Sequence, residues 1–565
     1  MEIYNKIKNK IKASLPFICL VITIIILIYP LIGNKVSYGH DYLFHATNNI
    51  LNYTNIDVFK LNMLLPKIFG GTIANGFGYG TGIFYPPMTY YLTSYITFIF
   101  NLSYQNCVLS LTYLEILIII ASGLVMYKFT KRISKDNHVA AISSITYISY
   151  SYFLCNIYTR NALGESLIAV FLPLVFYGLY ELFNNNDKKF YLLFIIGYIG
   201  MIHSHLVISL FITIIILIIF IINYKKVFKK DIIIKLSIAS ILILLISSPY
   251  LVPLLEHKIY GNYTVFEKNT MYQDSQIIEY TLSLSDYLLV KYKTQNGIEL
   301  YFSFVTLVTT ILTIIYNKKI FKKANKKIYF NTLLLIIISV IISSKIFPWE
   351  KMPYFIKIIQ FPWRLCILTS FGISILSGYF IKLIDKKYQK IIACLIIVLI
   401  IFFGYATIPR ENLTTVFHPS KMHMGNQYEY LPINTKNNLS YFNSRNQDII
   451  IKEGNANINI TKNNTPYLKS EIALISNSIK VELPRLYYLG YEIIMKDEKG
   501  NKNAIKYYEN EFGFIELELT KSGILEVNYK GTLASKISNY ICIIAIITWI
   551  SVIIYIKYQD KIHIK

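Results

Sequence analysis

LPFICLVITIIILIYPLIG, residues Leu15 to Gly33, is an apolar run without a charged side chain. Its length matches the ~20 residues that an α-helix needs to cross the hydrocarbon of a bilayer. A second run of this kind, LVISLFITIIILIIFIINY, occupies Leu206 to Tyr224, and similar runs recur along the 565 residues. Hydrophobic residues make up 54% of the chain, and the mean hydropathy is +0.45. The sequence therefore predicts an α-helical membrane protein that crosses the bilayer many times.

The net charge of +24 is arranged in a way that argues against nucleic-acid binding. Basic residues gather in short loops between apolar runs, at 6–12, 128–135, 225–230 and 318–327. Such loops set the orientation of a membrane protein by the positive-inside rule, and they contact anionic lipid heads. We therefore interpret the charge as a sign of topology and of contact with membrane lipids. The six cysteines have no paired spacing, which favours packing residues over disulfides or metal ligands.

Alternation of basic and less basic loops predicts about twelve crossings, with both termini on the cytoplasmic side. The expected spans are Leu15–Gly33, Cys107–Tyr127, 139–155, 166–183, 190–203, 206–224, 232–249, 299–316, 329–344, 364–382, 391–408 and Ser538–Ile556. No small-residue cleavage site follows the first span, so we expect a retained anchor. Residues 34–106 form one large outer loop. Within it, Met88–Phe100 is expected to be an interfacial or re-entrant helix, because a further crossing would place the basic residues at 128–135 outside.

The character of the chain changes between residues 409 and 536. Apolar and polar residues alternate through NSIKVELPRLYYLGYEIIM (Asn477–Met495), and turn signals follow at Glu498–Asn501 and Lys521–Gly523. A period of two predicts antiparallel strands, which we expect to form a small extracytoplasmic β-sandwich. The predicted organisation is a transmembrane domain over 1–408, this β-rich domain over 409–536, and a final helix with a cytoplasmic tail over 537–565.

The outer loop begins with GHDYLFHATNN, residues Gly39 to Asn49. Asp41 and His45 are four residues apart, so they share one face of a helix, and the helix dipole would keep Asp41 ionised in the first turn. That position suits a helix cap, a metal ligand and a general base equally well. Glycines between 70 and 82 permit close approach of a ligand to the backbone, which favours a functional role. His40 and His45 are undecided between shaping a site and touching a substrate.

Two further segments on the predicted outer side contain arginine at the membrane boundary. YTRNALGES (Tyr158–Ser166) contains Arg160 and Glu165, and IIQFPWRLC (Ile358–Cys366) contains Arg364. The rigid donors of arginine match phosphate oxygens, so each arginine is a candidate to bind a lipid phosphate. The alternative for each is an interfacial anchor, paired in the first case with Glu165.

Three other positions add polar groups to the predicted outer side or next to it. His203 and His205 flank an outer turn, where they either bind a metal or a diphosphate or form a plain polar turn. Glu115 lies within an expected span, where a carboxyl group is costly, so it is either functional or neutral and hydrogen-bonded. Glu429 lies between two tyrosines in QYEYLPIN (Gln427–Asn434), a combination that suits sugar rings.

The order of these segments resembles that of a known bacterial membrane family. GHDYLFH, NGFGYGTGIFYPP, YTRNALGES, SSPYLVPLLE, QFPWR and YEYLP follow one another as in the 6-pyruvoyl-tetrahydropterin synthase-related proteins, which are similar to YfhO-like proteins. Nothing in the sequence suggests a soluble pterin enzyme. Both groups resemble the GT-C glycosyltransferases, which are multi-spanning enzymes with an acidic residue in the first outer loop.

The resemblance implies a glycosyltransferase of the bacterial cell membrane that moves a hexosyl or pentosyl group from a polyprenyl-phosphate-linked donor to an extracytoplasmic cell-envelope polymer. Asp41 matches the acidic position, so it would activate the acceptor hydroxyl or hold a divalent cation such as Mg²⁺ or Mn²⁺. Arg160 and Arg364 would stabilise the departing lipid phosphate. The substrate-binding residues expected with them are His40, His45, Glu165, His203, His205 and Glu429. Many GT-C enzymes have paired acidic residues here, whereas this sequence has a single Asp beside His40, which leaves metal dependence open.

Two classes of protein compete with the transferase interpretation. A transporter or lipid flippase would show inverted repeats with broken spans at matching positions, but Pro86–Pro87 and the Pro249/Pro253 pair are not symmetric. A non-catalytic scaffold that presents the outer β domain would not need Asp, His and Arg in separate loops. The sequence favours the transferase, and it identifies neither the sugar nor the acceptor nor the oligomeric state.

Overall fold

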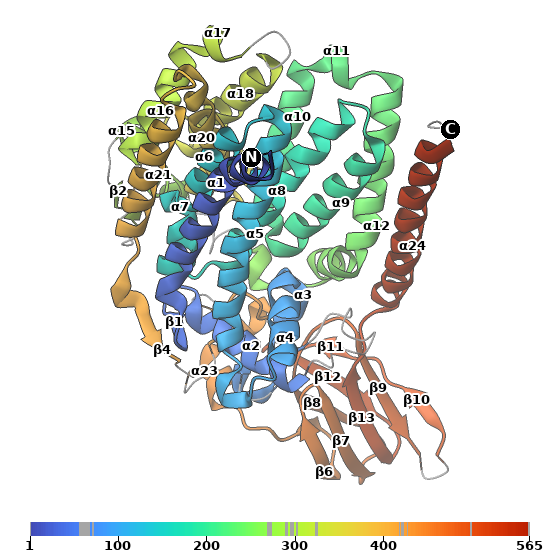
Figure 1. The fold of residues 1–565 in the computed structure, drawn as a ribbon. Helices are drawn as coiled ribbons and strands as arrows, with labels where there is room; N and C mark the ends of the chain where they lie inside the picture. The colour runs from blue at the N-terminus through green and yellow to red at the C-terminus, as the bar shows by residue number, and fades with distance from the viewer. Residues whose placement is uncertain are drawn as a thin grey trace.

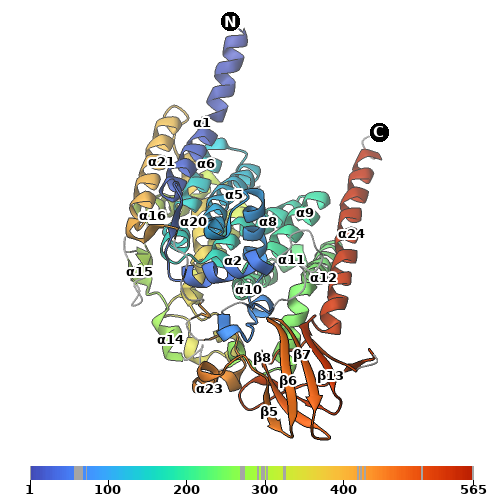
Figure 2. The same ribbon diagram turned by 90° about the horizontal axis from the view of Figure 1, so that it is seen from below.

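The computed structural model describes residues 2–55, 68–70, 73–267, 274–288, 292–293, 299–300, 303–321, 326–416, 419, 423–425, 428–497 and 500–562. The chain forms a helical part and a C-terminal β-sheet region (Figure 1). Both ends of the chain lie at the end of the helical part that is remote from the sheets (Figure 2).

The described helices have the following bounds: α1 (Glu2–Ile28), α2 (Tyr42–Asn55), α3 (Thr81–Phe84), α4 (Met88–Ile99), α5 (Leu109–Ser134), α6 (Asn137–Ile148), α7 (Ser151–Leu154), α8 (Leu163–Leu182), α9 (Asp187–Ser204), α10 (Leu206–Ile222), α11 (Tyr224–Val227), α12 (Lys230–Tyr260), α14 (Asp274–Glu279), α15 (Leu284–Leu288), α16 (Phe304–Ile315), α17 (Asn317–Ile320), α18 (Lys326–Ser343), α19 (Tyr354–Lys357), α20 (Cys366–Tyr379), α21 (Gln389–Ala406), α22 (Ile433–Asn437), α23 (Leu439–Ser444) and α24 (Leu533–Ile562).

Eight helical segments in the described part of the chain are long and apolar enough to cross a membrane. They are Ser14–Leu31, Leu109–Ser134, Leu163–Leu182, Lys230–Tyr260, Lys326–Ser343, Pro362–Leu383, Gln389–Ala406 and Leu533–Gln559. Two more apolar helices, Leu206–Ile222 and Phe304–Ile315, are shorter. The prediction of a multi-pass helical membrane protein is confirmed, but the count of twelve crossings is not.

The helices differ in how far other helices surround them. The span Pro362–Leu383 is 89% buried within the protein, whereas Leu533–Gln559 is 17% buried. A helix that is apolar on all sides and has few protein neighbours exposes its side chains to lipid. The helix α20 is therefore central, and α24 lies at the edge of the bundle beside α12 (Figure 1).

The span expected at 139–155 is interrupted in the structure. The side chain of Asp136 accepts hydrogen bonds from the backbone N–H groups of His138 and Val139 and so caps α6, which ends after 12 residues. The short α7 and a π-helical turn, Cys155–Thr159, follow. Single π-turns often occur at functional sites. This one leads directly to Arg160.

The described part of the loop at 34–106, which the sequence predicts to lie outside, is folded against both parts of the molecule. Its strand β1 (Lys35–Ser37) pairs antiparallel with β4 (Leu413–Thr415), which follows α21. The helix α4 has 12 residues and packs against α2 and α5. A helix of this length spans about 18 Å, less than the ~30 Å of hydrocarbon, which fits the interfacial helix expected at Met88–Phe100.

The β-sheet region consists of antiparallel strands, as the alternation predicts. One sheet has the order β10-β9-β13-β7-β6, and the other has the order β11-β12-β8-β5. Their bounds are β5 (Ile450–Glu453), β6 (Ala456–Asn464), β7 (Tyr467–Leu474), β8 (Ile479–Leu486), β9 (Tyr491–Lys496), β10 (Lys502–Ala504), β11 (Tyr508–Glu509), β12 (Phe514–Leu519) and β13 (Gly523–Tyr529). A separate hairpin joins β2 (Tyr292–Lys293) to β3 (Glu299–Leu300).

The core of the sheet region includes residues of the first outer loop. Buried Phe77 and Tyr79 belong to the same apolar cluster as Val481 of one sheet and Val527 of the other. The backbone N–H of Leu486 donates to the carbonyl of Phe77 at 3.0 Å. The loop and the sheets therefore fold as one packed unit, which lies beside the outer loop's polar segment.

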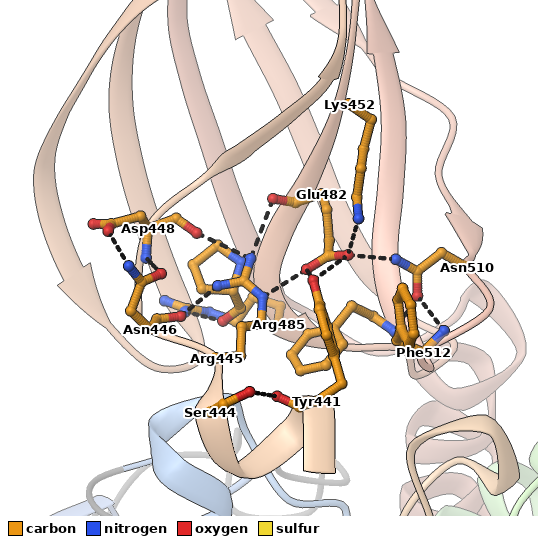
Figure 3. Close-up of polar contacts among 12 residues, drawn as sticks. Tyr441, Ser444, Arg445, Asn446, Asp448, Lys452, Glu482, Arg485, Asn510 and Phe512 are labelled. Carbon is orange, nitrogen blue, oxygen red and sulfur yellow. Dashed lines mark hydrogen bonds and ion pairs between the residues drawn. The ribbon is translucent and has the colours of Figure 1, made fainter. Parts of the chain in front are cut away.

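The buried carboxylate of Glu482 on β8 binds Tyr441 and Arg445, which precede the sheet strands in the chain. Glu482 accepts hydrogen bonds from Arg445 Nε at 2.6 Å, Tyr441 Oη at 2.8 Å and Asn510 Nδ2 at 2.7 Å, and Lys452 Nζ lies 3.2 Å away (Figure 3). These contacts use the acceptor capacity of both carboxylate oxygens. We therefore interpret Glu482 as a structural clamp.

Candidate functional site

The polar segment of the outer loop is hydrogen-bonded along its backbone to the loop that carries Arg160. The N–H of His40 donates to the carbonyl of Thr159 at 3.3 Å, and the N–H of Asp41 donates to the carbonyl of Arg160 at 2.8 Å. A Cβ atom on Gly39 would lie 2.6 Å from the carbonyl carbon of Arg160. Only glycine permits so close an approach of two backbones. Gly39 is therefore the residue that allows Asp41 to lie beside Arg160.

Glu165, in the first turn of α8, joins the two arginines that the sequence singles out. Arg160 Nη1 and Nη2 donate to its two oxygens at 2.6 and 3.0 Å, and Arg364 Nε donates to Oε1 at 2.9 Å. Tyr152 Oη donates to Oε2 at 2.9 Å. The side chains are buried, with 6%, 3% and 7% of Arg160, Glu165 and Arg364 exposed. Two buried cations against one carboxylate leave an excess of positive charge, which an anion would balance.

Aromatic rings and polar acceptors hold both guanidinium groups. Arg160 lies 4.5 Å from the ring centroid of Trp363, and its Nη1 also donates to Asn156 Oδ1 at 2.7 Å. Arg364 lies 4.6 Å from the ring centroid of Phe361. Arg160 Nε and Arg364 Nη2 donate to no residue that the structure describes. Both arginines are thus fixed in position and not extended toward solvent as interfacial anchors, and each retains a donor for a further ligand.

The carboxyl groups of Asp41 and Glu429 interact electrostatically with these arginines. The carbonyl of Asp41 accepts the first helical bond from His45 N at 3.0 Å, which makes Asp41 the N-cap of α2. Burial raises the pKa of Asp41, and Arg160 opposes the rise. Burial and Asp41 together raise the pKa of Glu429 to about 7, against the effect of Arg364. Burial thus acts against the ionised form that the first turn of a helix favours.

Two histidines border this cluster. His205 Nε2 lies 4.0 Å from Glu165 Oε1, and His205 Nδ1 accepts the N–H of Ile208 at the start of α10. Burial and Arg364 lower the pKa of His205 to about 3, so its ring is neutral and carries its proton on Nε2. His40 is exposed as a whole residue. The pKa of its ring is nevertheless lowered, mainly by partial desolvation and to a smaller extent by the charge of Arg160.

The other two histidines lie at the margin. His45 is buried on α2 against the rings of Tyr85 and Tyr90, and burial lowers its pKa to about 3. Its Nδ1 has no hydrogen-bond partner among the described residues. His203, on α9, packs against Tyr250 with ring centroids 5.8 Å apart. The structure therefore groups Asp41, His40, Arg160, Glu165, His205, Arg364 and Glu429 and leaves His45 and His203 beside the group.

Sequence reasoning missed Tyr85 as a member of the site. Tyr85 follows the glycine-rich stretch of the outer loop and interacts electrostatically with Asp41, Glu165 and Arg364. A Cβ atom on Gly164 would lie 3.1 Å from its hydroxyl oxygen, so the ring reaches the first turn of α8. The only signal was a tyrosine directly before two prolines, a pattern that fixes a backbone turn without indicating what the side chain meets.

Glu115 has a direct structural explanation. The carboxyl group is fully buried within α5, and its Oε1 accepts a hydrogen bond from Asn161 Nδ2 at 2.6 Å. Asn161 adjoins Arg160 in the chain. Of the two alternatives that the sequence left open, the hydrogen-bonded carboxyl fits, and Glu115 supports the loop that carries Arg160.

The described donors do not fit a divalent cation. Within the part of the chain that the structure describes, no three His, Cys, Asp or Glu side chains converge as metal ligands do. Asp41 and Glu429 share their surroundings with the guanidinium groups of Arg160 and Arg364, which repel a cation. We therefore derive no chemical step through a metal.

The fold and the comparisons with known proteins identify the class. The chain is a multi-pass helical membrane protein with a C-terminal β-sheet region. Residues 83–410 match the membrane family described as 6-pyruvoyl-tetrahydropterin synthase related domain. The chain belongs to this family.

One relative and two solved structures are similar to the chain. An uncharacterized protein of Lactococcus lactis subsp. cremoris (strain MG1363) is 24% identical over 360 residues, covering 61% of this chain and 56% of that protein. The chain thus spans about half the length of this curated relative. The cryo-EM structure of the arabinofuranosyltransferase AftD from Mycobacteria has a TM-score of 0.45 at 11% identity, covering 70% of this chain and 27% of that one. The archaeal oligosaccharyltransferase AglB from Archaeoglobus fulgidus, in complex with an inhibitory peptide and a dolichol-phosphate, has a TM-score of 0.33 at 12% identity, covering 74% and 57%.

Proposed function

We propose that this protein is a membrane glycosyltransferase that moves a sugar from a polyprenyl-phosphate-linked donor to an acceptor of the cell envelope. One observation carries the proposal. Two buried arginines share a single glutamate and retain unused donors, and a carboxyl group with a raised pKa lies beside them. An excess of buried positive charge suits a phosphate, and a carboxyl group suits a hydroxyl.

The arginines would act on the leaving group. As the bond between the sugar's anomeric carbon and the phosphate oxygen breaks, its electron pair leaves with the phosphate, which gains negative charge. Arg160 and Arg364 are already held in place by Glu165 and by aromatic rings, so they need little reorganisation to stabilise that charge. Glu165 is a positioning residue in this scheme, because its two oxygens are engaged by the arginines and by Tyr152.

Asp41 would act on the acceptor. In its ionised form, its carboxylate takes the proton of the acceptor hydroxyl while the hydroxyl oxygen forms the new bond to the anomeric carbon. A base is most effective when its pKa lies near the working pH, and burial moves Asp41 in that direction. Glu429 and Tyr85 interact electrostatically with Asp41, and His40 precedes it in the chain, so these three residues would contact the sugar or the acceptor.

The proposed orientation places this site and the sheet region outside the cell. The transmembrane domain then covers 1–408 with its outer loop at 34–106, the extracytoplasmic domain covers 409–536, and the last helix and cytoplasmic tail cover 537–565. Support comes from the two chain ends, which both lie at the end remote from the sheets, and from the basic loops of the sequence (Figure 2).

The test is sugar transfer by the full-length protein in nanodiscs, supplied with synthetic polyprenyl-phosphate sugars and cell-envelope acceptors. We expect Asp41→Asn to abolish release of polyprenyl phosphate and to leave the melting temperature nearly unchanged. Asp136→Asn is the matched control, because Asp136 also caps a helix, α6, but lies outside the cluster. Transfer by Asp41→Asn at the wild-type rate would overturn the role of Asp41.

A further inference from the structure

Three lysines gather at the end of the helical part that is remote from the sheets. Lys226 belongs to the short helix α11, Lys229 directly precedes α12, and Lys327 lies in the first turn of α18. Figure 1 shows α11 and α17, the helix that precedes α18, at this same end of the bundle. None of the three lysines belongs to the proposed catalytic site, so the cluster is a separate feature of the molecule.

A hydrogen bond between two asparagines joins the segments that carry these lysines. Asn223 Nδ2, at the end of α10, donates to Asn331 Oδ1 on α18 at 3.1 Å. Lys327 is four residues before Asn331, so the two side chains share one face of α18. The backbone N–H of Lys226 donates to the carbonyl of Asn223 at 3.0 Å. The lysines therefore converge at the junction of α10, α11 and α18.

The charges at this junction are close enough to oppose one another. Desolvation, followed by the charges of Lys327 and Lys229, lowers the pKa of Lys226. The Nζ atom of Lys226 lies 4.5 Å from the ring centroid of Phe183, which holds it in this position. Within the described part of the chain, none of the three lysines forms an ion pair, and Asp231, two residues after Lys229, pairs with a different lysine. The protein thus leaves the positive charge of the cluster uncompensated.

This arrangement differs from that of an ordinary orienting loop. Basic loops orient a membrane protein by their charge alone, and such charges need no burial. The loop at 382–390 is of this kind, because Lys386, Lys387 and Lys390 are exposed. Lys226 is half-buried, and burial of a charged group is unfavourable unless an opposite charge compensates it. The partial burial of Lys226 beside two further cations therefore indicates a bound anion.

The surroundings restrict the chemistry of that anion. Ile222 and Phe330, each directly before one of the bonded asparagines, are 46% and 50% exposed. Exposed apolar side chains next to lysines suit a ligand that has both acyl chains and phosphate. One phosphodiester would compensate a single charge of the three, whereas two phosphates compensate twice as much. Basic sites between transmembrane helices bind lipid headgroups of this kind on the cytoplasmic side.

We propose that Lys226, Lys229 and Lys327 bind the headgroup of a phospholipid with two phosphates, whose acyl chains lie against α10 and α18. The ammonium groups donate to the phosphate oxygens. This proposal does not depend on the proposed transferase activity, because it concerns a different set of residues at the opposite end of the helical part.

The experiment uses the full-length protein in nanodiscs of phosphatidylcholine, with lipid retention measured by native mass spectrometry. The probes are cardiolipin, phosphatidylglycerol at equal total charge, and soluble pyrophosphate. We expect selective retention of cardiolipin. The triple variant Lys226→Gln/Lys229→Gln/Lys327→Gln should weaken retention by about 100-fold, at about fivefold for each lysine lost. Substitution of the same three lysines by arginine keeps charge and donors, so it should preserve retention.

Lys386→Gln/Lys387→Gln/Lys390→Gln is the matched control. It removes the same charge from exposed side chains, and none of these three acts on Lys226. Retention of cardiolipin should stay within about threefold of the wild type, since exposed charges contribute little.

Four results would each overturn the proposal. Equal retention of phosphatidylglycerol would show that two phosphates are not recognised. Equal losses in the two glutamine variants would mean that the lysines act only through general charge. Displacement of cardiolipin by equimolar pyrophosphate would identify a site for free phosphate. Absence of any retained lipid would mean that the lysines serve orientation alone.

Discussion

Glu165 and Glu482 are buried glutamates that each bind an arginine and a second cation, and their surroundings differ. At Glu482, every nitrogen of Arg445 that can donate has a protein acceptor, and the second cation, Lys452, keeps 30% of its side chain exposed (Figure 3). At Glu165, the second cation is Arg364, with 9% of its side chain exposed. The first cluster is complete and in contact with water, whereas the second holds excess buried charge and unused donors.

The degree to which the donors and charges are satisfied distinguishes a structural cluster from a candidate catalytic one better than residue type does. Both clusters contain Glu, Arg, Tyr and Asn, so their composition does not distinguish them. A saturated network fixes one arrangement of the chain. An undercompensated one remains able to accept a ligand, at a cost that the rest of the fold must offset. Variants of the two clusters should therefore fail in different ways.

The largest effect on stability is expected in the Glu482 cluster, whose donors all have protein acceptors. Arg445→Ala leaves Glu482 buried without its main partner, which should lower the free energy of unfolding by about 3–5 kcal/mol. Thermal unfolding in detergent measures the loss. Activity per folded molecule should stay at the wild-type level. A large fall in the activity of folded protein, with stability unchanged, would reverse our assignment of the two clusters.

The next effect should appear in the rate and not in stability. Arg364→Lys keeps the positive charge but removes the fork of donors, so transfer should slow by about 10²–10³-fold, or about 3–4 kcal/mol in the activation barrier. The control is Arg132→Lys. Arg132 forms an ion pair with Glu181, which lies on α8 like Glu165, and the Arg132 side chain is 36% exposed. That change should matter little. Similar rates for the two variants would contradict the role of Arg364.

Stability should depend on pH through Glu429. Its pKa is raised from 4.5 to about 7 in the folded protein, mainly by burial. The folded state therefore holds this proton more tightly than the unfolded state, so stability is highest below pH 4.5 and falls as the pH rises through 7. The loss is up to about 3 kcal/mol. Melting temperatures across this range should fall for the wild type and should fall less for Glu429→Gln. If the melting temperatures of the wild type and of Glu429→Gln changed with pH to the same extent, the raised pKa of Glu429 would be contradicted.

The smallest stability effect is expected at Gly39. In Gly39→Ala, the added Cβ would lie 2.6 Å from the carbonyl carbon of Arg160 and must push the two loops apart, at a cost of about 1–3 kcal/mol. The rate should suffer more, because a displacement of ~1 Å in a catalytic group reduces rates by ~10²-fold. Comparison of the melting temperature with the transfer rate in the same preparation measures both. A normal rate in a destabilised protein would show that Asp41 does not act from this position.

The sequence predicted the elements well where a single periodic pattern decided them. The run at Leu15–Gly33 and the alternation around β8 and β9 require only local information, because lipid and a two-layer sheet impose periods on the side chains. The break after α6 was missed, since a 17-residue apolar stretch at 139–155 is compatible with an unbroken helix. The prediction of twelve crossings depended on counting such stretches.

The pairing inside the site lay beyond sequence reasoning. Arg160 and Glu165 are five residues apart, so their contact was open to prediction, but Arg364 reaches the same glutamate from 199 residues away. The environment of Asp41 also depended on packing: its place at the start of α2 suggested a stabilised anion, whereas burial in the folded protein raises its pKa.

The amino-acid sequence by itself determined that this chain is a multi-pass membrane protein with a β-sheet region, because hydropathy and periodicity act over short stretches. It also named the residues that carry charge next to the membrane. Only the tertiary structure decided which of them meet and which charges remain uncompensated. Coulombic and desolvation energies depend on distance and burial in three dimensions, and neither quantity is written in the spacing of residues along the chain.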